Sequence, residues 1–351
     1  YSGTDSCAMM VPFRRYYHYG DIENKGWEIS LNTHPLIGAF EWDSDFQISF
    51  NRNKLRALDG TANAQIVGYG QWSDVVSVTN VGESLYNFYG YVCDGVYEDL
   101  EDLQTSAKPA KYPADGVFNR TNTVWVGDIK YKDLNGDGVI DENDRTNIGS
   151  PLPKFTFGWT NTFRYKNFDL SLFINGSYGN KVFNYLGMKL THMNSPWSNQ
   201  LNTVLDRAQI VPIDPNKDYS AGVVVNGVTI YNWYDDITNV RVANAGATIP
   251  RASIQDPNDN DRISDRYIED GSYIRLKNIT LGYTFPGKII KKWGLDNLRV
   301  YANIQNLLTI TGYSGYDSEI GASTASANVY GLDNGRYPSP TVYSFGLNVS
   351  F

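Results

Sequence analysis

The sequence predicts an all-β fold, the antiparallel transmembrane β-barrel of an outer membrane, and three observations support this fold class. The chain ends in a strand with one wholly apolar face. An internal strand sets carboxylates opposite aromatic side chains, and long and short connections alternate between the predicted strands. Together these features predict a sheet with one face toward lipid and the other toward water.

The C-terminal strand, residues 341–351, gives the first observation. Its alternate positions are Tyr343, Phe345, Leu347, Val349 and Phe351, with polar or small residues between them. Successive side chains of a strand point to opposite faces, so these five share one face. The length also suits a tilted strand crossing a bilayer, which needs about 9–11 residues. A soluble β-sandwich could carry the same alternation, so this strand alone leaves both folds open.

Residues 40–50 give the second observation. Aromatic and aliphatic side chains occupy Phe40, Trp42, Phe46, Ile48 and Phe50, and Glu41, Asp43, Asp45, Gln47 and Ser49 stand between them. Three carboxylates on one face suit a wet surface or a water-filled lumen but not a dry core. A strand predicted at 27–33 precedes this one and has Trp27, Ile29 and Leu31 on one face.

The order of the connections gives the third observation. Further strands are predicted at 154–165, 168–175, 273–285 and 297–309. The connections at 34–39, 166–167 and 286–296 are short, whereas 176–270 and 310–340 are long. Outer-membrane barrels have short turns at one rim and long loops at the other. The predicted strand directions place both long connections at the same rim, a rule that a soluble sandwich has no reason to obey. Residues 53–125 are less regular, with a strand expected at 84–92 and a helical excursion at 98–104.

Composition narrows the possible functions. The 351 residues include 26 Tyr and 32 Gly but only 4 Met, and the net charge is −8 without a Lys/Arg cluster. This charge argues against a nucleic-acid partner. No run of about 18 apolar residues predicts a transmembrane helix. No nucleophile, base or phosphate-loop pattern predicts an enzyme. Cys7 and Cys93 have no metal-type spacing, and we expect unpaired thiols.

Residues 133–144 carry the one recognisable chemical motif. Their spacing follows an EF-hand-type loop, with ligands expected from Asp133, Asn135, Asp137, the Val139 carbonyl, Asp141 and Asp144. Gly138 supplies the sharp turn at the sixth position. Ligands that are all oxygen atoms favour a hard cation, so Ca²⁺ is expected in a structural role. Position 12 is Asp rather than the usual Glu, and its shorter arm reaches less far. The alternative is an Asx-turn loop without metal.

Aromatic residues in the long connections are candidates for contact with a substrate or a lid. These residues are Trp197, Trp233, Tyr234, Tyr313 and Tyr316. Their rings could stack on sugars, and they could equally pack the loops together. His18, His34 and His192 are scattered without ligand spacing, and we interpret them as surface or rim residues.

Several segments resemble the SusC/RagA family of TonB-dependent outer-membrane transporters of Bacteroidetes. These segments are residues 24–28, 127–141, 153–158, 175–181, 273–283, 303–308 and 337–340, followed by the aromatic C-terminus. The resemblance covers nearly the whole chain. It implies a barrel of about 22 strands, of which this chain forms the C-terminal part, without the N-terminal plug, the TonB box or the early strands.

The resemblance also implies a function. It implies import of oligosaccharides or peptides across the outer membrane, driven by TonB, with a SusD-like surface lipoprotein as the barrel's partner. Residues 127–150, with the calcium motif, and the long connections 176–270 and 310–340 would then be extracellular. The cargo stays open between sugar and peptide.

Two other functions remain open from the residues themselves. One is a soluble secreted calcium-binding β-module that binds glycans, which predicts a monomer that is soluble without detergent. The other is a passive porin, which predicts that no plug precedes the barrel in the full gene.

Overall fold

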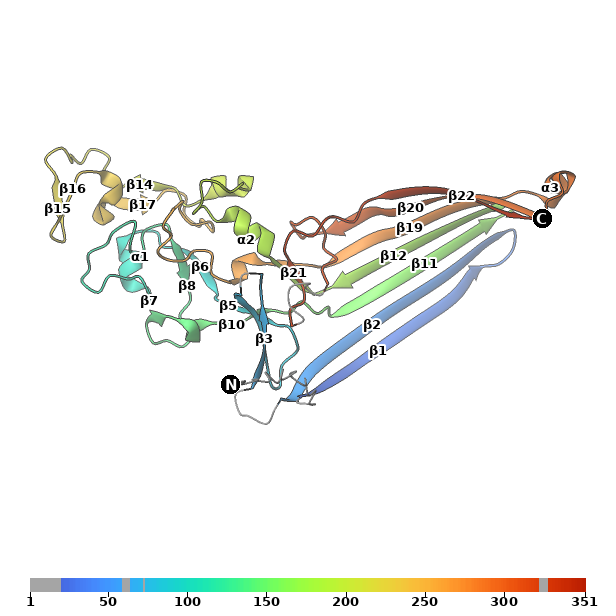
Figure 1. Cartoon of the computed structure of the whole chain (residues 1–351), viewed down its shortest axis with the longest axis horizontal. Coiled ribbons are helices and arrows are strands. Elements are labelled where there is room, and N and C mark those ends of the chain that lie inside the picture. The colour runs from blue at the N-terminus through green and yellow to red at the C-terminus, as the bar shows by residue number, and fades with distance from the viewer. Residues whose placement is uncertain (1–19, 59–63, 72, 322–327) are drawn as a thin grey trace, which may run out of the picture.

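The computed structural model describes residues 20–58, 64–71, 73–321 and 328–351. Cys7 and His18 lie outside the described residues. The molecule is elongated, with a sheet of long strands at one end and a lobe of short elements at the other (Figure 1). We refer to these two parts as the sheet and the lobe. The two ends of the sheet are the lobe end and the turn end.

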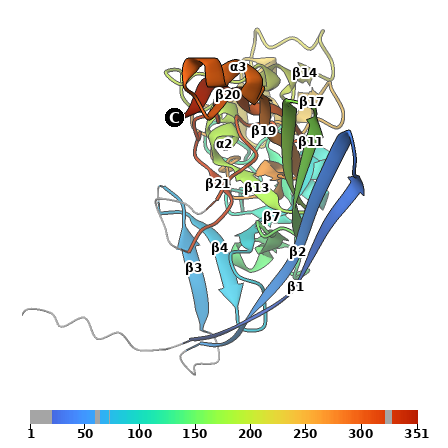
Figure 2. The ribbon, with the colours of Figure 1, turned by 90° about the vertical axis from the view of Figure 1, so that its right-hand side faces the viewer.

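Seven long strands form the sheet, and every neighbouring pair is antiparallel. Their order is β1 (Gly20–Leu36), β2 (Phe40–Leu58), β11 (Phe155–Tyr165), β12 (Phe168–Tyr178), β19 (Tyr273–Thr284), β20 (Asn297–Thr311) and β22 (Val342–Ser350). Seen from the turn end, the strands follow an arc with β1 and β22 at its edges (Figure 2). All three short connections lie at the turn end, and the long ones lead into the lobe. The predicted strands and their directions are therefore confirmed, although several strands are longer than expected.

One face of the sheet is apolar. Strand register places Leu281 beside Ala302, which in turn lies beside Phe345, and Val300 lies beside Leu347. These side chains are open to the surroundings, with Phe345 84% and Leu347 60% exposed. Two polar groups on this face are satisfied internally. Trp42 Nε1 donates to Asn161 Oδ1, and Trp159 Nε1 donates to Ser44 Oγ, each at 2.9 Å.

The opposite face is polar and carries ion pairs between strands. Arg164 Nη1 lies 2.5 Å from Asp43 Oδ2, and Arg299 Nε lies 3.0 Å from Asp169 Oδ1. The second pair crosses β19 above Gly282, where a Cβ would meet atoms of both partners. This face therefore carries the carboxylates that the sequence set opposite the aromatic residues.

The turn end is built from compact connections. Lys166 has φ 54°, the left-handed conformation that a two-residue hairpin turn requires, and joins β11 to β12. The connection from β19 to β20 contains α3 (Gly287–Ile290) and a 3₁₀ turn at Lys291–Trp293, which ends at Gly294 with φ 71°. No helix in the described part of the chain is long and apolar enough to cross a membrane.

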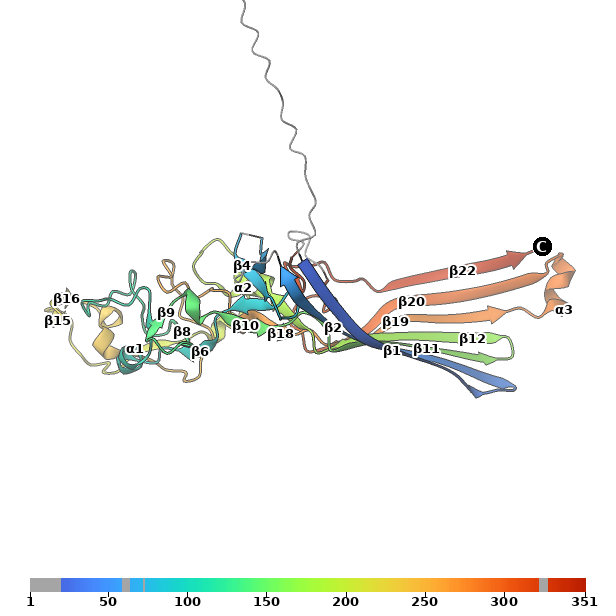
Figure 3. The ribbon, with the colours of Figure 1, turned by 90° about the horizontal axis from the view of Figure 1, so that it is seen from below.

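The lobe consists of short strands and helices drawn from the long connections, and it continues the sheet along the long axis (Figure 3). Its four-stranded sheet has the order β10 (Thr146–Gly149), β5 (Phe88–Gly90), β4 (Val75–Asn80) and β3 (Gln65–Tyr69), and its three-stranded sheet has the order β18 (Ile268–Asp270), β13 (Lys181–Asn184) and β21 (Leu332–Asp333). The other strands pair two by two: β14 (Ile210–Pro212) with β17 (Val240–Val242), β15 (Val223–Val225) with β16 (Val228–Ile230), β6 (Cys93–Val96) with β8 (Ile129–Tyr131), and β7 (Lys108–Pro109) with β9 (Val139–Ile140). Its helices are α1 (Leu100–Thr105) and α2 (Tyr185–Thr191), with 3₁₀ turns at Glu142–Asp144, Asn202–Asp206, Trp233–Asp235, Ile237–Asn239 and Asp265–Tyr267.

Two apolar cores hold the lobe together. One surrounds Trp125 and Ile129, and the other surrounds Phe88 and Phe183, all of which are fully buried. Beside the first core, Arg251 Nε donates to Asp128 Oδ1 at 2.7 Å, joining residues 123 positions apart. Both side chains are buried, and such a pair is costly to break because a lone buried charge would remain.

One sequence prediction about the lobe was wrong. The strand expected at 84–92 exists only at Phe88–Gly90, because Tyr86 adopts φ 67° and ends the extended run. The long connection predicted at 176–270 has structure of its own. It contains strands, turns and α2, and several of these elements contribute side chains to the two cores.

Candidate functional site

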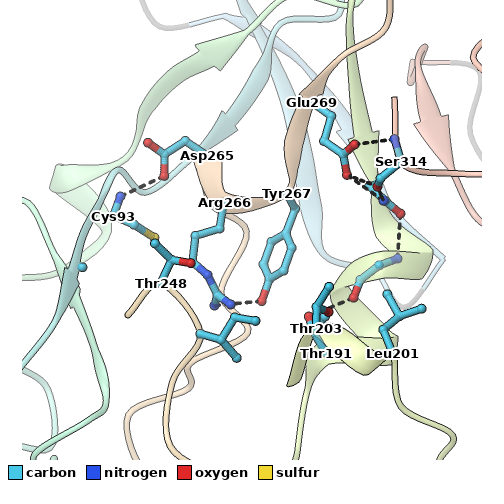
Figure 4. Close-up of a pocket in the computed structure, with 14 residues that line it drawn as sticks. Cys93, Thr191, Leu201, Thr203, Thr248, Asp265, Arg266, Tyr267, Glu269 and Ser314 are labelled. Carbon is cyan, nitrogen blue, oxygen red and sulfur yellow. Dashed lines mark hydrogen bonds between the residues drawn. The ribbon is translucent and has the colours of Figure 1, made fainter. Parts of the chain in front are cut away.

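A cavity of about 540 Å³ lies in the lobe where segments from several long connections meet. Its walls come from β6, from α2, from residues 248–249 and from the turn that leads into β18, and Ser314 contributes from the last connection (Figure 4). Concave sites of this size, with a few converging polar groups, are typical places for ligands.

Backbone pairing positions one wall of this cavity. Tyr91 forms a bridge with Ser264, and Tyr91 N–H donates to the Ile263 carbonyl at 2.9 Å. Gly90 permits this approach, because a Cβ there would collide with the Ile263 carbonyl. The Cys93 N–H then donates to Asp265 Oδ1 at 2.9 Å. The turn Asp265–Tyr267 is thereby fixed at the edge of the cavity.

The charged groups in the cavity differ in how far they are satisfied. Glu269 Oε1 accepts from Asn184 Nδ2 and Ser314 Oγ, and Glu269 Oε2 accepts from Ser314 N–H, each at 2.8 Å. Arg266 Nη1 donates to the Asn260 carbonyl at 3.1 Å and to Tyr267 Oη at 3.2 Å. Burial raises the pKa of the Cys93 thiol to about 12, so this thiol is neutral and unreactive near neutral pH.

The predicted calcium loop is wrapped by its own backbone. Asp133 accepts from the N–H groups of Gly136 at 2.6 Å and Gly138 at 2.8 Å, and Gly138 has φ 84°. These N–H groups, that of Gly138 first, lower the pKa of Asp133, so the side chain is ionised. Asp144 is buried and accepts from Leu134 N–H at 2.8 Å and Asp141 N–H at 2.9 Å.

The other ligands of this loop form Asx-type turns. Asn135 Oδ1 accepts from Asp137 N–H, Asp137 Oδ1 from Val139 N–H, and Asp141 Oδ1 from Asn143 N–H. The described carboxylates of the loop do not bring three ligand atoms within 4.8 Å of one another. The structure therefore has the predicted turns and an ionised first ligand, and the metal itself stays a prediction.

The five loop aromatic residues fall into two groups. Trp197 is 93% and Tyr316 66% exposed. The others contact their surroundings. Tyr313 is buried and its hydroxyl donates to Asp333 Oδ2 at 2.6 Å, Trp233 packs on the first core, and Tyr234 lies edge-on to Trp233 with a centroid separation of 5.8 Å. Trp197 and Tyr316 are the two best placed to meet a partner.

His192 is not the surface residue that the sequence suggested. Its Nε2 lies 2.9 Å from Asp256 Oδ2, and its Nδ1 lies 3.0 Å from Asp261 Oδ2. Burial lowers the pKa of His192, but the hydrogen bonds to both carboxylates outweigh it and raise the pKa to about 9. An imidazolium donates from both nitrogens and has no lone pair for a metal. This His/Asp cluster is therefore a charged hydrogen-bonded triad.

The last long connection folds onto the polar face of the sheet. Arg275, on that face of β19, places Nη2 2.5 Å from Asp317 Oδ1 and Nη1 2.9 Å from Glu319 Oε2. Asp317 Oδ2 also accepts from Ser339 Oγ at 2.6 Å. Burial raises the pKa of Asp317, but the hydrogen bonds from Ser339 and from Glu319 N–H, together with Arg275, lower it to about 2. This buried pair fastens residues 313–321 to the sheet.

Sequence reasoning missed the cavity, the His192 triad and the Arg275–Asp317 pair. Each joins residues that are far apart in the sequence: the cavity combines three connections, the triad spans residues 192–261, and the ion pair links β19 to residue 317. No short motif marks any of them. In the sequence, a charged residue of a polar loop looks the same whether it is exposed or buried. Its role becomes visible only when the fold brings it next to its partner.

Comparison with known proteins places the chain in a family. It is 33% identical over 340 residues to TonB-dependent receptor P3 of Formosa agariphila, covering 95% of this chain and 29% of that protein. It is 26% identical over 353 residues to TonB-dependent receptor SusC of Bacteroides thetaiotaomicron, covering 99% of this chain and 28% of SusC. This chain matches the C-terminal portion of SusC/RagA-type TonB-dependent receptors of Bacteroidetes.

Solved structures agree with the SusC/RagA assignment at the level of fold. The RagAB peptide transporter superposes with a TM-score of 0.60 at 19% identity, covering 95% of this chain and 30% of that one. The RagAB peptide importer in its open-open state gives a TM-score of 0.59. No family model matches the chain. The chain thus spans about 30% of the length of its relatives. The predicted family and outer-membrane location are confirmed, and the predicted fold class is confirmed as the C-terminal part of the RagA barrel, of which this chain forms an open sheet.

Proposed function

We propose that this chain supplies the last strands of a non-enzymatic TonB-dependent importer for oligosaccharides or peptides. The observation that carries the proposal is the two-faced sheet. An exposed apolar face as continuous as the one around Leu281, Val300, Phe345 and Leu347 is rare on soluble monomers and suits contact with lipid. The hydrogen bond from Trp42 to Asn161 removes an unpaired polar group from that face, as a lipid environment requires.

The polar face is proposed to line the path of the cargo. The ion pairs of Asp43 with Arg164 and of Asp169 with Arg299 are partly exposed, and they suit a water-filled or protein-filled lumen. Residues 313–321 fold over the lobe end of this face and narrow the path there. Tyr316, exposed on that segment, is proposed to contact cargo.

The lobe is proposed to lie outside the cell and to contact a SusD-like surface lipoprotein. It lies beyond the lobe end of the strands, where the long connections gather (Figure 1). RagAB, whose fold this chain matches, is described as a peptide transporter. Trp197, 93% exposed, is the proposed contact with the lipoprotein. The similarity to RagAB supports a peptide as cargo. The resemblance in sequence also allows an oligosaccharide, so both cargo classes remain in the proposal.

A structural Ca²⁺ ion at residues 133–144 is part of the proposal. Asp133, Asn135, Asp137, the Val139 carbonyl, Asp141 and Asp144 would hold it. The ionised Asp133 and the turns at Gly136 and Gly138 support this site. The Asp133→Ala/Asp137→Ala variant of the full-length transporter should lose protease resistance in residues 127–150, and EDTA should do the same to the wild type. If neither treatment changes cleavage, the loop is held by its Asx turns alone.

Cysteine accessibility along β22 tests the proposed transporter. Single cysteines at Leu347 and Phe345 in the full-length protein in liposomes should react with a lipid-dissolved thiol reagent. Cysteines at Ser344 and Asn348 should react with a water-soluble reagent. This alternation follows from the opposite faces of successive residues. If all four positions react with the water-soluble reagent alone, the soluble glycan-binding module becomes the better account.

A further inference from the structure

One edge of the Arg266 guanidinium, formed by Nε and Nη2, indicates an unassigned binding site in the lobe cavity. Its Nη1 is fully engaged by the Asn260 carbonyl and Tyr267 Oη. Among the described residues, Nε and Nη2 donate no hydrogen bond, and Arg266 forms no ion pair with a carboxylate. A guanidinium has N–H donors and no acceptor, so these two N–H groups are available to an acceptor on a ligand.

The free edge has a specific shape. The Nε–H and Nη2–H groups lie parallel in one plane, and this fork matches the two oxygens of a carboxylate. The Nη1 contacts, together with stacking of the guanidinium carbon 5.0 Å from the Tyr267 ring centroid, fix the plane of the fork. Thr248 lines the same cavity as Arg266 (Figure 4), and its hydroxyl has no partner among the described residues. A ligand oxygen held by Arg266 could also accept from this hydroxyl.

Two carboxylates line the same cavity without pairing with Arg266. Asp265 Oδ1 accepts the Cys93 N–H, and Glu269 accepts from Asn184 and Ser314, so both are held by other donors. Their negative charge opposes a simple anion. It favours a ligand that presents N–H or O–H donors near its carboxylate, as a peptide or an acidic sugar does.

We propose that this cavity binds a carboxylate group of the cargo through Nε and Nη2 of Arg266. The inference rests on the proposed import function, because it takes the ligand to be the cargo. The carboxylate has two sources, a peptide or the uronate of an oligosaccharide. The cavity volume of about 540 Å³ accommodates a few residues or one to three sugar rings of either.

Binding of matched probes to the purified full-length transporter tests the site. The probes are two matched pairs, each with a free acid and a neutral form: tetra-alanine and its C-terminal amide, and tetragalacturonate and its methyl ester. The affinity of each probe is measured by calorimetry. The free acid of one pair should bind more tightly than its neutral form. Arg266→Gln should weaken that acid about 10- to 100-fold, the range for a charge-assisted bidentate pair, and leave the neutral form unchanged. The pair that responds identifies the source.

Three further variants separate the fork from charge and from folding. Arg266→Lys keeps the charge but loses the fork and should bind almost as weakly as Arg266→Gln. Arg241→Gln, an exposed arginine of β17 outside the cavity, should bind as the wild type does. Thr248→Val removes a hydroxyl that has no partner, so it leaves the fold intact, and it should weaken the acid several-fold.

The inference is overturned if neither acid binds more tightly than its neutral form, or if Arg266→Gln and Thr248→Val leave the acid's affinity unchanged. An equal loss for the acid and neutral forms would also overturn it. The cysteine alternation along β22 is independent of this site. Alternation without carboxylate selectivity would refute the cavity site alone, whereas selectivity without alternation would refute the transporter and leave a carboxylate-binding module.

Discussion

Neutralising Asp317 should release residues 313–321 from the polar face of the sheet. The Asp317 and Arg275 side chains are 2% and 3% exposed, and their closest atoms are 2.5 Å apart. Removing one partner of a buried ion pair costs about 3–5 kcal/mol. In Asp317→Asn, Arg275 keeps Glu319 at 2.9 Å, but that partner is 41% exposed and compensates only in part. We expect a cost of about 2–4 kcal/mol, which corresponds to roughly 30- to 900-fold more frequent opening.

Amide hydrogen exchange of the full-length transporter in nanodiscs measures this opening directly. Peptides covering residues 313–321 should exchange faster in Asp317→Asn by the factor above, and peptides from β12 should not change. Glu319→Gln is the matched control, because an exposed partner contributes less than about 1 kcal/mol. Equal exchange in Asp317→Asn and Glu319→Gln would refute the argument that the buried pair fastens the segment.

Two further predictions concern the sheet and the lobe. Gly176→Ala should destabilise the folded protein by about 1–3 kcal/mol in urea titrations, because its Cβ would meet the Phe157 ring and lie 2.7 Å from the Tyr273 carbonyl oxygen. Gly158→Ala is the control and should cost less, because its Cβ meets its nearest atom at 3.4 Å. Equal costs for the two variants would contradict this packing argument. The pKa of His192 is about 9 in the folded protein, against 6.5 for an ordinary histidine. Protonated His192 therefore stabilises the folded protein by up to about 3 kcal/mol. This stabilisation is fully present below pH 6.5 and is lost as the pH rises through 9. Limited proteolysis of the lobe should therefore accelerate between pH 7.5 and 10 in the wild type, and an equally steep rise in His192→Gln would exclude this triad as the cause.

The sheet could be predicted from the sequence because its strands carry their own signal. Phe345 and Leu347 face one side and Ser344 and Asn348 the other, and this period of two persists over whole strands. Strand directions followed from the lengths of the connections. The ends were less certain, since β12 runs on to Tyr178 beyond its last clear alternation.

The lobe could not be predicted in the same way. Its strands are mostly two to four residues long, too short for a period to emerge. Its stability depends on contacts between distant residues, such as Arg251 with Asp128 across 123 positions. The calcium motif was recognisable because all its ligands lie within 12 consecutive residues. The cavity was not, because Cys93, Arg266 and Ser314 meet only after three connections have folded.

The most direct test of the central claim is the cost of a charge on each face of the sheet. Leu347→Arg and Phe157→Arg place a charge on the apolar face, and Ser344→Arg and Thr156→Arg place it on the polar face. The full-length transporter would be unfolded with urea from phospholipid vesicles. The account predicts a loss of about 2–4 kcal/mol for the apolar-face variants nearest the bilayer centre and little loss for the polar-face variants. Equal losses on both faces would contradict a lipid-facing sheet.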